Sequence, residues 1–274
     1  NSQSVSDIIQ RGGTFLGTAR CPEFKQEETR KEALKILQSH GIEGLVIIGG
    51  DGSLTGGSLL SDLGMPIVGL PGTIDNDVWG SDYTIGADTA LNTILDAINK
   101  LRDTASAHRR IIVLEVMGRK CGWLAMMAGI AGGAEYVLVP EVKYDLNKIC
   151  DELKTSYDNG RRYSIVVVTT FVVDEAEGVG SAVDIGKEIG EKTGIDTRVT
   201  VLGHVQRGGS PTAEDRVKAS MLGEKAALAL LNGQSNIVFG INEGKVVAID
   251  LHDSVNNNKT LDPELVRLAR VLSK

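Results

Sequence analysis

The sequence predicts an α/β fold in which two lobes each contain a mostly parallel sheet with helices on both faces. Short runs of β-branched and aliphatic residues alternate with amphipathic helical patterns along almost the whole chain, which is typical of βαβ units. Glycine is abundant, at 33 of 274 residues, and it clusters behind the strand-like runs. In open parallel sheets that position is where ligands bind.

The individual elements follow from their periodicity. Residues 27–39 carry an apolar stripe and predict the first helix. Strands are predicted in the Val-, Ile- and Leu-rich runs at 45–48, 66–70, 110–116, 136–139, 164–169, 198–202 and 237–240. Helices are predicted at 53–63, 86–103, 122–131, 146–157, 183–192, 213–231 and 263–271. Alternation around Glu243-Gly244 predicts a hairpin over 240–250, and the strand at 164–169 is expected to continue through 171–173.

Composition excludes several classes of protein. The chain carries 36 acidic and 29 basic residues, a net charge of −7, which argues against general binding to nucleic acid or an anionic membrane. No apolar run reaches the ~20 residues of a membrane span, and no secretory signal opens the sequence. The three cysteines lack metal-ligand spacing, so we expect neither a zinc site nor a disulfide framework. We expect a cytoplasmic location, where thiols stay reduced.

The GGDGS segment at 49–53 follows a predicted strand and precedes a predicted helix. Glycines let backbone amides turn toward a polyphosphate, and the helix N-terminus adds partial positive charge. Asp51 could then hold a Mg²⁺ ion that bridges phosphates. The alternative is a tight turn in which Asp51 or Ser53 caps the helix.

The PGTIDND segment at 71–77 follows the next strand. Asp75 and Asp77 are two residues apart, so in extended backbone they project to the same side. Such carboxylates can divide the work of accepting a proton and orienting a metal or cation. Taken alone, an acidic surface turn explains the same residues.

Cationic side chains gather near the ends of later strands. Arg110 and Arg119 flank one strand, and Arg198, His204 and Arg207 surround another. A guanidinium group offers a planar fork of donors to phosphate, although a lone surface arginine is usually only solvated. Together with the glycine loop and the paired carboxylates, these residues predict a transferase that moves phosphoryl groups between anionic ligands.

At these motifs the chain resembles the bacterial 6-phosphofructokinase family over essentially its whole length. GGDGS, PGTIDND, MGR and LGHVQRGG occur in the family's order and approximate spacing. The resemblance implies the phosphofructokinase fold, with two Rossmann-like three-layer α/β/α lobes. It further implies glycolytic transfer of the ATP γ-phosphoryl group to the 1-hydroxyl of fructose 6-phosphate. Residues 1–86 with 200–232 would form the nucleotide-binding lobe, and residues 87–199 with 233–274 the sugar-phosphate-binding lobe.

The resemblance also implies roles for individual residues. Asp75 would take the proton of the sugar hydroxyl, while Thr73 and Arg119 would steady the transferring phosphoryl group. ATP would be bound by Arg20, Cys21, Gly50, Asp51, Gly52 and Ser53, with Asp51 holding Mg²⁺. Fructose 6-phosphate would be contacted by Thr73, Asp75, Met117, Gly118, Arg119, Glu177, His204 and Arg207.

Quaternary structure and regulation are implied as well. Arg110 and Arg198 would reach the 6-phosphate from the neighbouring subunit of a homotetramer, so that active sites are shared. An allosteric site for a nucleoside diphosphate and phosphoenolpyruvate would use Ser6, Asp7, Arg102, Glu135 and Arg161.

The phosphoryl donor is predicted from two glycines. Pyrophosphate-dependent relatives typically carry aspartate at the position of Gly52 and lysine at that of Gly72. Both are glycine here, and a small residue at position 52 leaves room for the adenylate end of ATP. The prediction is therefore ATP.

Two departures from the family pattern matter. The family's opening strand and SGGDxxGMN loop do not occur in these residues, so we expect an open sheet edge, and weakened stability and ATP binding if no residues precede. The segment 169–175 also separates a strand from Ala-Glu-Gly. Alignment through the strand places Thr170 at the family's sugar-binding glutamate, whereas alignment back from Arg198 places Glu177 there and restores the motif.

Two other functions remain as alternatives. One is a catalytically silent subunit that binds sugar phosphate, and the intact Asp51, Asp75 and Arg119 count against it. The other is an enzyme similar to NAD kinases, which share a GGDG loop. The MGR and LGHVQRGG motifs count against that second alternative.

Overall fold

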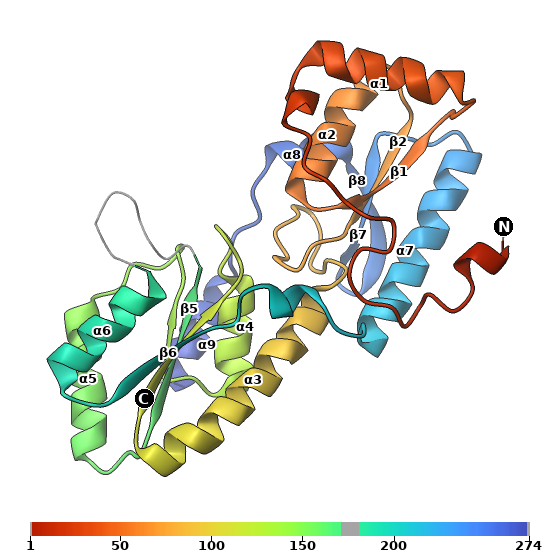
Figure 1. Cartoon of the computed structure of the whole chain (residues 1–274). Helices are drawn as coiled ribbons and strands as arrows, with labels where there is room; N and C mark the ends of the chain where they lie inside the picture. The colour runs from red at the N-terminus through yellow and green to blue at the C-terminus, as the bar shows by residue number, and fades with distance from the viewer. Residues whose placement is uncertain (1, 171–180, 273–274) are drawn as a thin grey trace. The chain divides into compact units, whose positions relative to one another are not determined.

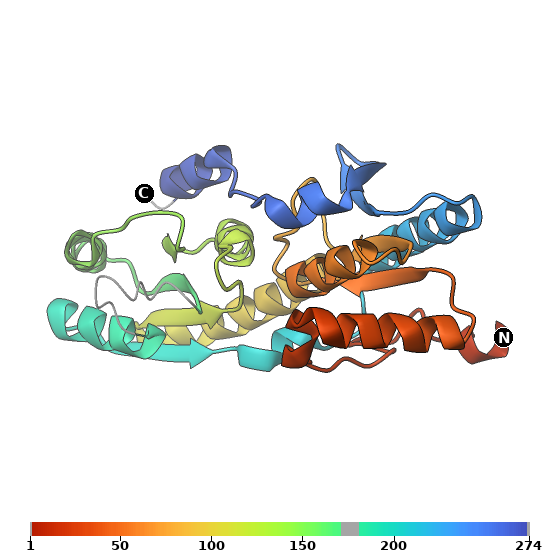
Figure 2. The same cartoon turned by 90° about the horizontal axis from the view of Figure 1, so that it is seen from above.

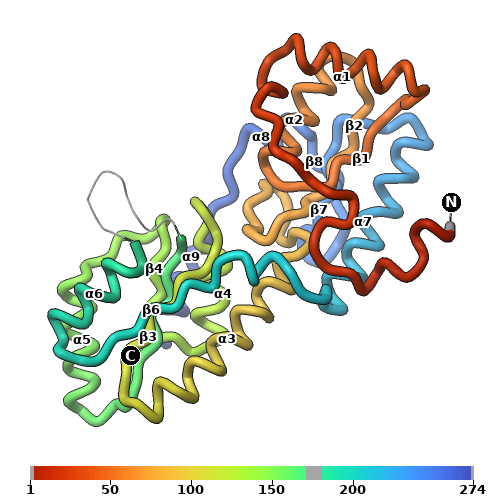
Figure 3. Tube along the Cα trace, in the orientation of Figure 1, coloured from red at the N-terminus to blue at the C-terminus, as the bar shows by residue number. Residues whose placement is uncertain are grey.

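A computed structural model describes residues 2–170 and 181–272 (Figure 1). The chain divides into two compact units, Asn1–Asp88 with Ser210–Lys259 and Thr89–Gly209 with Thr260–Lys274. The trace in Figure 3 follows the chain as it passes from one unit to the other. Each unit has its own sheet, with buried hydrophobic residues packed against it.

The first unit contains a four-stranded sheet in the order β1-β2-β7-β8. Its strands are β1 (Leu45–Gly49), β2 (Ile67–Pro71), β7 (Ile237–Asn242) and β8 (Lys245–Asp250). The first three are parallel, and β8 returns antiparallel to β7. Its helices are η1 (Ser2–Val5), η2 (Pro22–Lys25), α1 (Glu27–Ser39), α2 (Asp51–Ser61), α7 (Ala213–Leu231) and α8 (Leu251–Asn256).

Alternation along the strands of this sheet supplies two cores, one for each face. Ile67 of β2 packs with Leu54 of α2 and Leu251 of α8. The next residue, Val68, packs on the other face with Leu222 of α7. Helices therefore cover both faces of the sheet, which is the predicted three-layer arrangement.

β1 stands at one end of the strand order, and among the described residues no further strand pairs with it. An open edge was expected from the sequence. The Val46 and Ile48 side chains of β1, whose partners in β2 are Val68 and Leu70, are 40% and 54% exposed, so the sheet face beside this edge is also partly open.

The second unit contains a wholly parallel sheet in the order β4-β5-β3-β6. Its strands are β3 (Ile111–Val116), β4 (Tyr136–Leu138), β5 (Ser164–Thr169) and β6 (Thr197–Val201). Its helices are α3 (Ala87–His108), α4 (Trp123–Gly132), α5 (Leu146–Asp158), α6 (Ala182–Thr193), η3 (Gly203–Arg207) and α9 (Pro263–Leu272). The long helix α3 is drawn in yellow in Figure 2.

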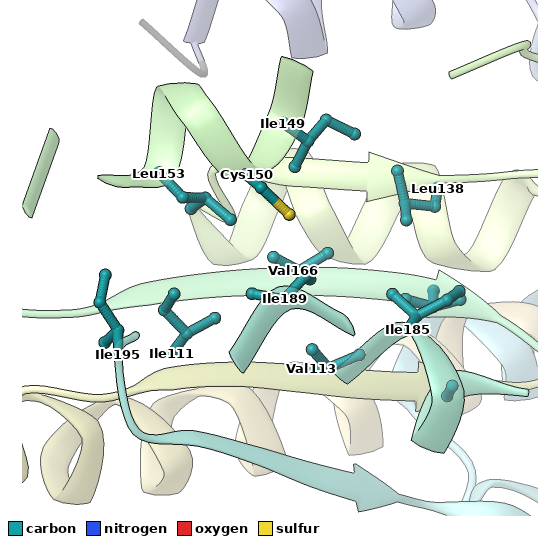
Figure 4. Close-up of a cluster of buried hydrophobic side chains, with 12 residues drawn as sticks. Ile111, Val113, Leu138, Ile149, Cys150, Leu153, Val166, Ile185, Ile189 and Ile195 are labelled. Carbon is teal, nitrogen blue, oxygen red and sulfur yellow. The ribbon is translucent and has the colours of Figure 1, made fainter. Parts of the chain in front are cut away.

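The core on one face of this sheet is shown in Figure 4. Val113 and Val166 of the strands meet Cys150 of α5 and Ile189 of α6, and all four are buried. Cys150 is a free thiol in this apolar cluster, and burial raises its pKa. It acts here as a packing residue.

Most predicted elements are confirmed within a residue or two. The helices at 27–39 and 213–231, the strand at 164–169 and the hairpin turn at Glu243-Gly244 lie where expected. Helix α3 runs five residues beyond the predicted end, to His108. The short helices η1, η2, η3 and α8 were not predicted, because segments of four to six residues are too short for a helical period to be recognised. The predicted strand residues 171–173 lie outside the described residues.

The predicted lobe boundaries differ from the observed division. Residues 233–259 belong to the first unit because β7 pairs with β2 there and β8 with β7. Residues 200–209 belong to the second unit, since 200–201 complete β6 and the following residues form the turn directly after it. Across the described residues, no helix is both long and apolar enough to cross a membrane.

Candidate functional site

The GGDGS segment forms the turn from β1 into α2. Gly50 is the N-cap residue, and its carbonyl oxygen accepts the N–H groups of Ser53 and Leu54, both at 3.0 Å. Among the described residues no side chain caps this helix, so the alternative of a cap from Asp51 or Ser53 is wrong. The uncapped amides and the exposed Asp51 leave a helix N-terminus that favours an anion.

The β1 and β2 loops pack tightly together. The N–H of Gly72 donates to the carbonyl of Gly49 at 2.9 Å. A Cβ atom at Gly72 would lie 2.9 Å from Cγ2 of Ile48 and 3.2 Å from the backbone nitrogen of Gly49, whereas one at Gly52 would meet nothing within 4 Å. A side chain at position 72 would therefore force Ile48 and the neighbouring backbone to shift, whereas position 52 has room for one.

Asp75 lies in a loop held by its own neighbours. The hydroxyl of Thr84 donates to the carbonyl of Thr73 at 2.7 Å, and the N–H of Ile85 donates to that of Pro71 at 2.8 Å. The N–H of Asp75 itself donates to the Thr73 hydroxyl at 3.2 Å. The Asp75 residue is 9% exposed, so these bonds hold the backbone of a largely buried aspartate near the carboxyl end of β2.

The backbone between the paired aspartates is not extended. Asn76 has a φ of 52° and is fully buried, with its amide donating to the carbonyl of Asp82 at 3.0 Å. The expectation that Asp75 and Asp77 project to one side assumed extended backbone, and the backbone at Asn76 does not meet that condition. Asparagine is one of the few residues that tolerates this conformation, and that preference is the signal sequence reasoning missed.

Asp215 anchors the same loop from α7. It is 1% exposed; the phenol of Tyr83 donates to its carboxylate, and so does the N–H of Gly86, at 2.6 Å. Burial and the adjacent carboxylate raise the pKa of Tyr83, so the phenol stays protonated as a donor. Sequence reasoning missed Asp215, because an acidic residue in the first turn of a helix is common for other reasons.

The predicted nucleotide residues Arg20 and Cys21 lie just before η2 and are exposed. The ring of Phe24 in η2 is 3.6 Å from the Cβ position of Gly56 in α2. The buried Arg30 donates to the carbonyl of Phe24 at 2.9 Å. These contacts hold η2 against α2, whose first turn carries Asp51, Gly52 and Ser53.

In the second unit, the MGR loop follows β3 and the HVQR turn follows β6. Gly118 has a φ of 152°, and a Cβ there would lie 2.4 Å from the carbonyl oxygen of Cys121. Arg119, His204 and Arg207 are exposed. Since β3 and β6 are neighbouring parallel strands, these three cationic or polar side chains share the carboxyl edge of one sheet.

Arg110 and Arg198 lie at the opposite end of the same strands. Arg110 precedes β3, and its Nε is 2.5 Å from Oδ2 of Asp196; Nη2 of Arg198 is 3.1 Å from Oδ1 of the same carboxylate. Six residues of β3 separate this pair from Met117, a span of about 20 Å. The prediction gave both arginines phosphate-binding roles but did not identify Asp196 as the residue that holds them together.

Three of the five predicted effector-site residues come together in the second unit. Nη1 of Arg161 is 2.7 Å from Oε1 of Glu135, and Arg102 donates to the carbonyl of Gly132 in the adjacent turn. Burial raises the pKa of Glu135. Ser6 and Asp7 belong to the first unit.

The sugar-binding glutamate position stays a prediction. Glu177 lies outside the described residues. Thr170 is described, and its hydroxyl and N–H both donate to the carbonyl of Val116 at 2.9 Å.

A Mg²⁺ site built only from protein ligands is absent: the described residues contain no group of three or more His, Cys, Asp or Glu side chains that could hold a metal ion. Asp51 supplies one exposed carboxylate beside an anion-favouring helix end. That donor set fits Mg²⁺ bound through a carboxylate together with substrate phosphates.

Comparison with known proteins gives a consistent result. A family model described as phosphofructokinase matches residues 1–230. The ATP-dependent 6-phosphofructokinase of Clostridioides difficile is 53% identical over 273 residues, covering 100% of this chain and 83% of the relative. The enzyme of the same name from Bacillus mycoides is 54% identical over 270 residues, covering 98% of this chain and 82% of the relative.

Solved structures agree. The phosphofructokinase structure from Saccharomyces cerevisiae matches with a TM-score of 0.84 and 37% identity, covering 93% of this chain and 38% of the yeast chain. A pyrophosphate-dependent phosphofructokinase from Nitrosospira multiformis matches with a TM-score of 0.86, over 100% of this chain and 77% of that one. At 20% identity that second match concerns the fold alone. The chain belongs to the phosphofructokinase family.

Proposed function

We propose that this chain is an ATP-dependent 6-phosphofructokinase, a phosphotransferase with an alcohol acceptor. The observation that carries the proposal is its identity of 52–54% with enzymes of that name over nearly its full length. The motifs that line the carboxyl edges of both sheets are consistent with it. The reaction turns fructose 6-phosphate and ATP into fructose 1,6-bisphosphate and ADP.

The chemistry assigned to Asp75 is general base catalysis. Oxygen 1 of the sugar forms a bond to the γ-phosphorus of ATP, and the bond from that phosphorus to the β,γ-bridging oxygen breaks. The proton of the 1-hydroxyl passes to the Asp75 carboxylate, and ADP leaves with the electron pair of the broken bond. The hydrogen bonds that fix the Thr73–Asp75 segment support this role, because a base must be held in place to be effective.

The charge of the transferred group requires cations. We assign Arg119 to the transferring phosphoryl oxygens, and Met117, Gly118, His204 and Arg207 to the sugar phosphate. Exposure of the Arg119, His204 and Arg207 side chains at one sheet edge supports this assignment. Asp51 would hold Mg²⁺, which neutralises phosphate charge when bound.

Two glycines support ATP as the phosphoryl donor. Pyrophosphate-dependent relatives typically carry aspartate at the position of Gly52 and lysine at that of Gly72, and this chain carries neither. The assignment agrees with the names of the similar enzymes.

A homotetramer with shared sites is part of the proposal. Arg110 and Arg198 lie at the strand ends opposite the MGR loop, so they suit a phosphate bound by another subunit. Glu135 and Arg161 pair at the same amino edge and are assigned, with Arg102, Ser6 and Asp7, to an effector site for a nucleoside diphosphate or phosphoenolpyruvate.

The test is a phosphoryl-transfer assay with fructose 6-phosphate and Mg²⁺, in which ATP and pyrophosphate are supplied separately. We expect fructose 1,6-bisphosphate to form when ATP is the donor and not when pyrophosphate is the donor. Turnover with pyrophosphate alone would contradict the donor assignment. Binding of fructose 6-phosphate with no turnover from either donor would contradict the catalytic proposal and favour a silent sugar-phosphate-binding subunit.

A further inference from the structure

Gln206 stands apart from its neighbours in the turn after β6. It is 1% exposed and is the buried residue of η3, whereas Val205 beside it is 63% exposed. His204 and Arg207, on either side, are also exposed. A fully buried amide inside an otherwise solvent-facing turn must have its polar atoms satisfied within the protein.

Both ends of the Gln206 amide are engaged. Its Oε1 accepts the backbone N–H of Met117 at 3.1 Å, and its Nε2 donates to the carbonyl of Gly203 at 2.9 Å. One side chain thus joins the loop after β3 to the turn after β6. These are the two segments to which the sugar phosphate is assigned.

The amide continues the pairing of the two strands beyond their last residues. The final backbone bond between them runs from the N–H of Leu202 to the carbonyl of Glu115 at 3.1 Å. The chain then turns into η3, so no backbone carbonyl of β6 continues the ladder toward Met117. The Gln206 side chain supplies an acceptor for the N–H of the half-buried Met117, which stabilises the loop because a shielded N–H without a partner is unfavourable.

The loop that Gln206 holds has little freedom of its own. Gly118 and Arg119 both have positive φ, at 152° and 51°, and the N–H of Cys121 donates to the carbonyl of Gly118 at 2.8 Å. Immediately before Met117, the carbonyl of Val116 accepts the N–H of Thr170 at 2.9 Å. Met117 lies two residues before Arg119 in this hydrogen-bonded segment, so a contact that places Met117 also helps to place the Arg119 backbone.

We propose that Gln206 is a positioning residue for the sugar phosphate, which sets the MGR loop in register with His204 and Arg207. This inference rests on the proposed function. Gln206 does not contact the ligand itself, because it is buried beneath the turn. It acts by fixing the spacing between the cationic side chains of two separate loops.

The first test replaces Gln206 by Met, which keeps most of the volume and removes both hydrogen bonds. Misplaced binding groups can cost on the order of tenfold to a hundredfold, so we expect the KM for fructose 6-phosphate to rise at least tenfold. The KM for ATP should change less than about twofold by the same logic, because the nucleotide residues lie in the other unit. Direct titration of the sugar phosphate should show the same loss.

Thr193→Val is the matched control. Thr193 is also buried in the second unit, and its hydroxyl donates to the carbonyl of Ile189 at 2.7 Å and accepts the N–H of Ile195 at 3.2 Å. Both variants lose buried hydrogen bonds and should be less stable to urea. Only Gln206→Met should weaken sugar-phosphate binding. Equal changes in KM for the two variants would overturn the positioning role.

Gln206→Glu adds a pH signature and serves if the Met variant does not fold. When protonated, the carboxyl group can still accept from the N–H of Met117 and donate to the carbonyl of Gly203, as the amide does. When ionised, it has no proton to donate, and its oxygen faces the Gly203 carbonyl as a second acceptor. We expect the ratio of variant to wild-type KM to be near one at acid pH and to grow as pH rises. The phosphate of the substrate also titrates, but it affects the KM of both proteins equally and cancels in the ratio.

The outcomes separate this inference from the proposed function. A wild-type chain that neither binds nor phosphorylates fructose 6-phosphate overturns both. A wild-type chain that binds it, with Gln206 variants whose affinity lies within about twofold of wild type at every pH, overturns only the role of Gln206.

Discussion

Acidic side chains play different parts in the two units. In the first unit, Asp51 is exposed at the N-terminus of α2 and Asp75 is fixed just beyond β2, both at the edge where parallel sheets bind ligands. In the second unit, Glu135 and Asp196 lie at the amino edge and pair with arginines at 2.7 Å and 2.5 Å.

The difference shows how one acidic chain can handle ligands that are all anions. Carboxylates at the carboxyl edge of the first sheet suit a metal ion and a proton, because those are the cations of phosphoryl transfer. Carboxylates in the second unit instead pair with guanidinium groups, which we propose are held there for phosphates. Substitutions in the two units test this division.

Asp75→Ser should lower kcat by about two to four orders of magnitude, the usual contribution of a positioned general base. Binding of fructose 6-phosphate should survive, since the cationic loops of the second unit are untouched. Rapid-mixing kinetics and direct titration of the sugar phosphate check both halves. Unchanged turnover would remove Asp75 from the role of base.

Gly72→Ala and Gly52→Ala form a matched pair that tests how tightly the loop carrying Asp75 packs against the turn carrying Asp51. A Cβ at position 72 meets Ile48 at 2.9 Å, and overpacking of this kind costs about 1–3 kcal/mol. Gly52 lies in the first turn of α2 and faces open space, so its change should stay within about 1 kcal/mol. Urea unfolding measures both, and equal losses would contradict the steric argument.

Asp196→Asn should raise the KM for fructose 6-phosphate by a few fold. The carboxylate that holds Arg110 and Arg198 is 44% exposed, and exposed ion pairs contribute about 0.2–1 kcal/mol. Asp151→Asn, at an exposed position of α5, is the control and should leave the KM unchanged. A lower KM in Asp196→Asn would mean that Asp196 competes with the phosphate instead of orienting its ligands.

The fold was largely predictable because periodicity and strand-end glycines are local signals. The conformations of the site loops were harder to predict. Asn76, Gln206 and Asp215 act through contacts with residues distant in sequence or through an unusual backbone angle, and neither is visible in a local pattern. Asp196 could have been found, because it stands two residues before Arg198 and side chains at that spacing share a strand face.

Glu135→Gln should give the smallest effect, a change in how stability depends on pH. Burial raises the pKa of Glu135 above its ordinary value of 4.5, although Arg161 and the N–H of Ile165 oppose the shift. The folded state therefore holds the proton more tightly than the unfolded state, and this contribution is complete below pH 4.5 and is lost as pH rises through the folded-state pKa. The variant cannot ionise, so its free energy of unfolding should fall less than that of wild type over that range. If the free energies of unfolding of the variant and of wild type, measured with urea, changed in parallel between pH 4 and pH 7, Arg161 would fully compensate the buried charge of Glu135.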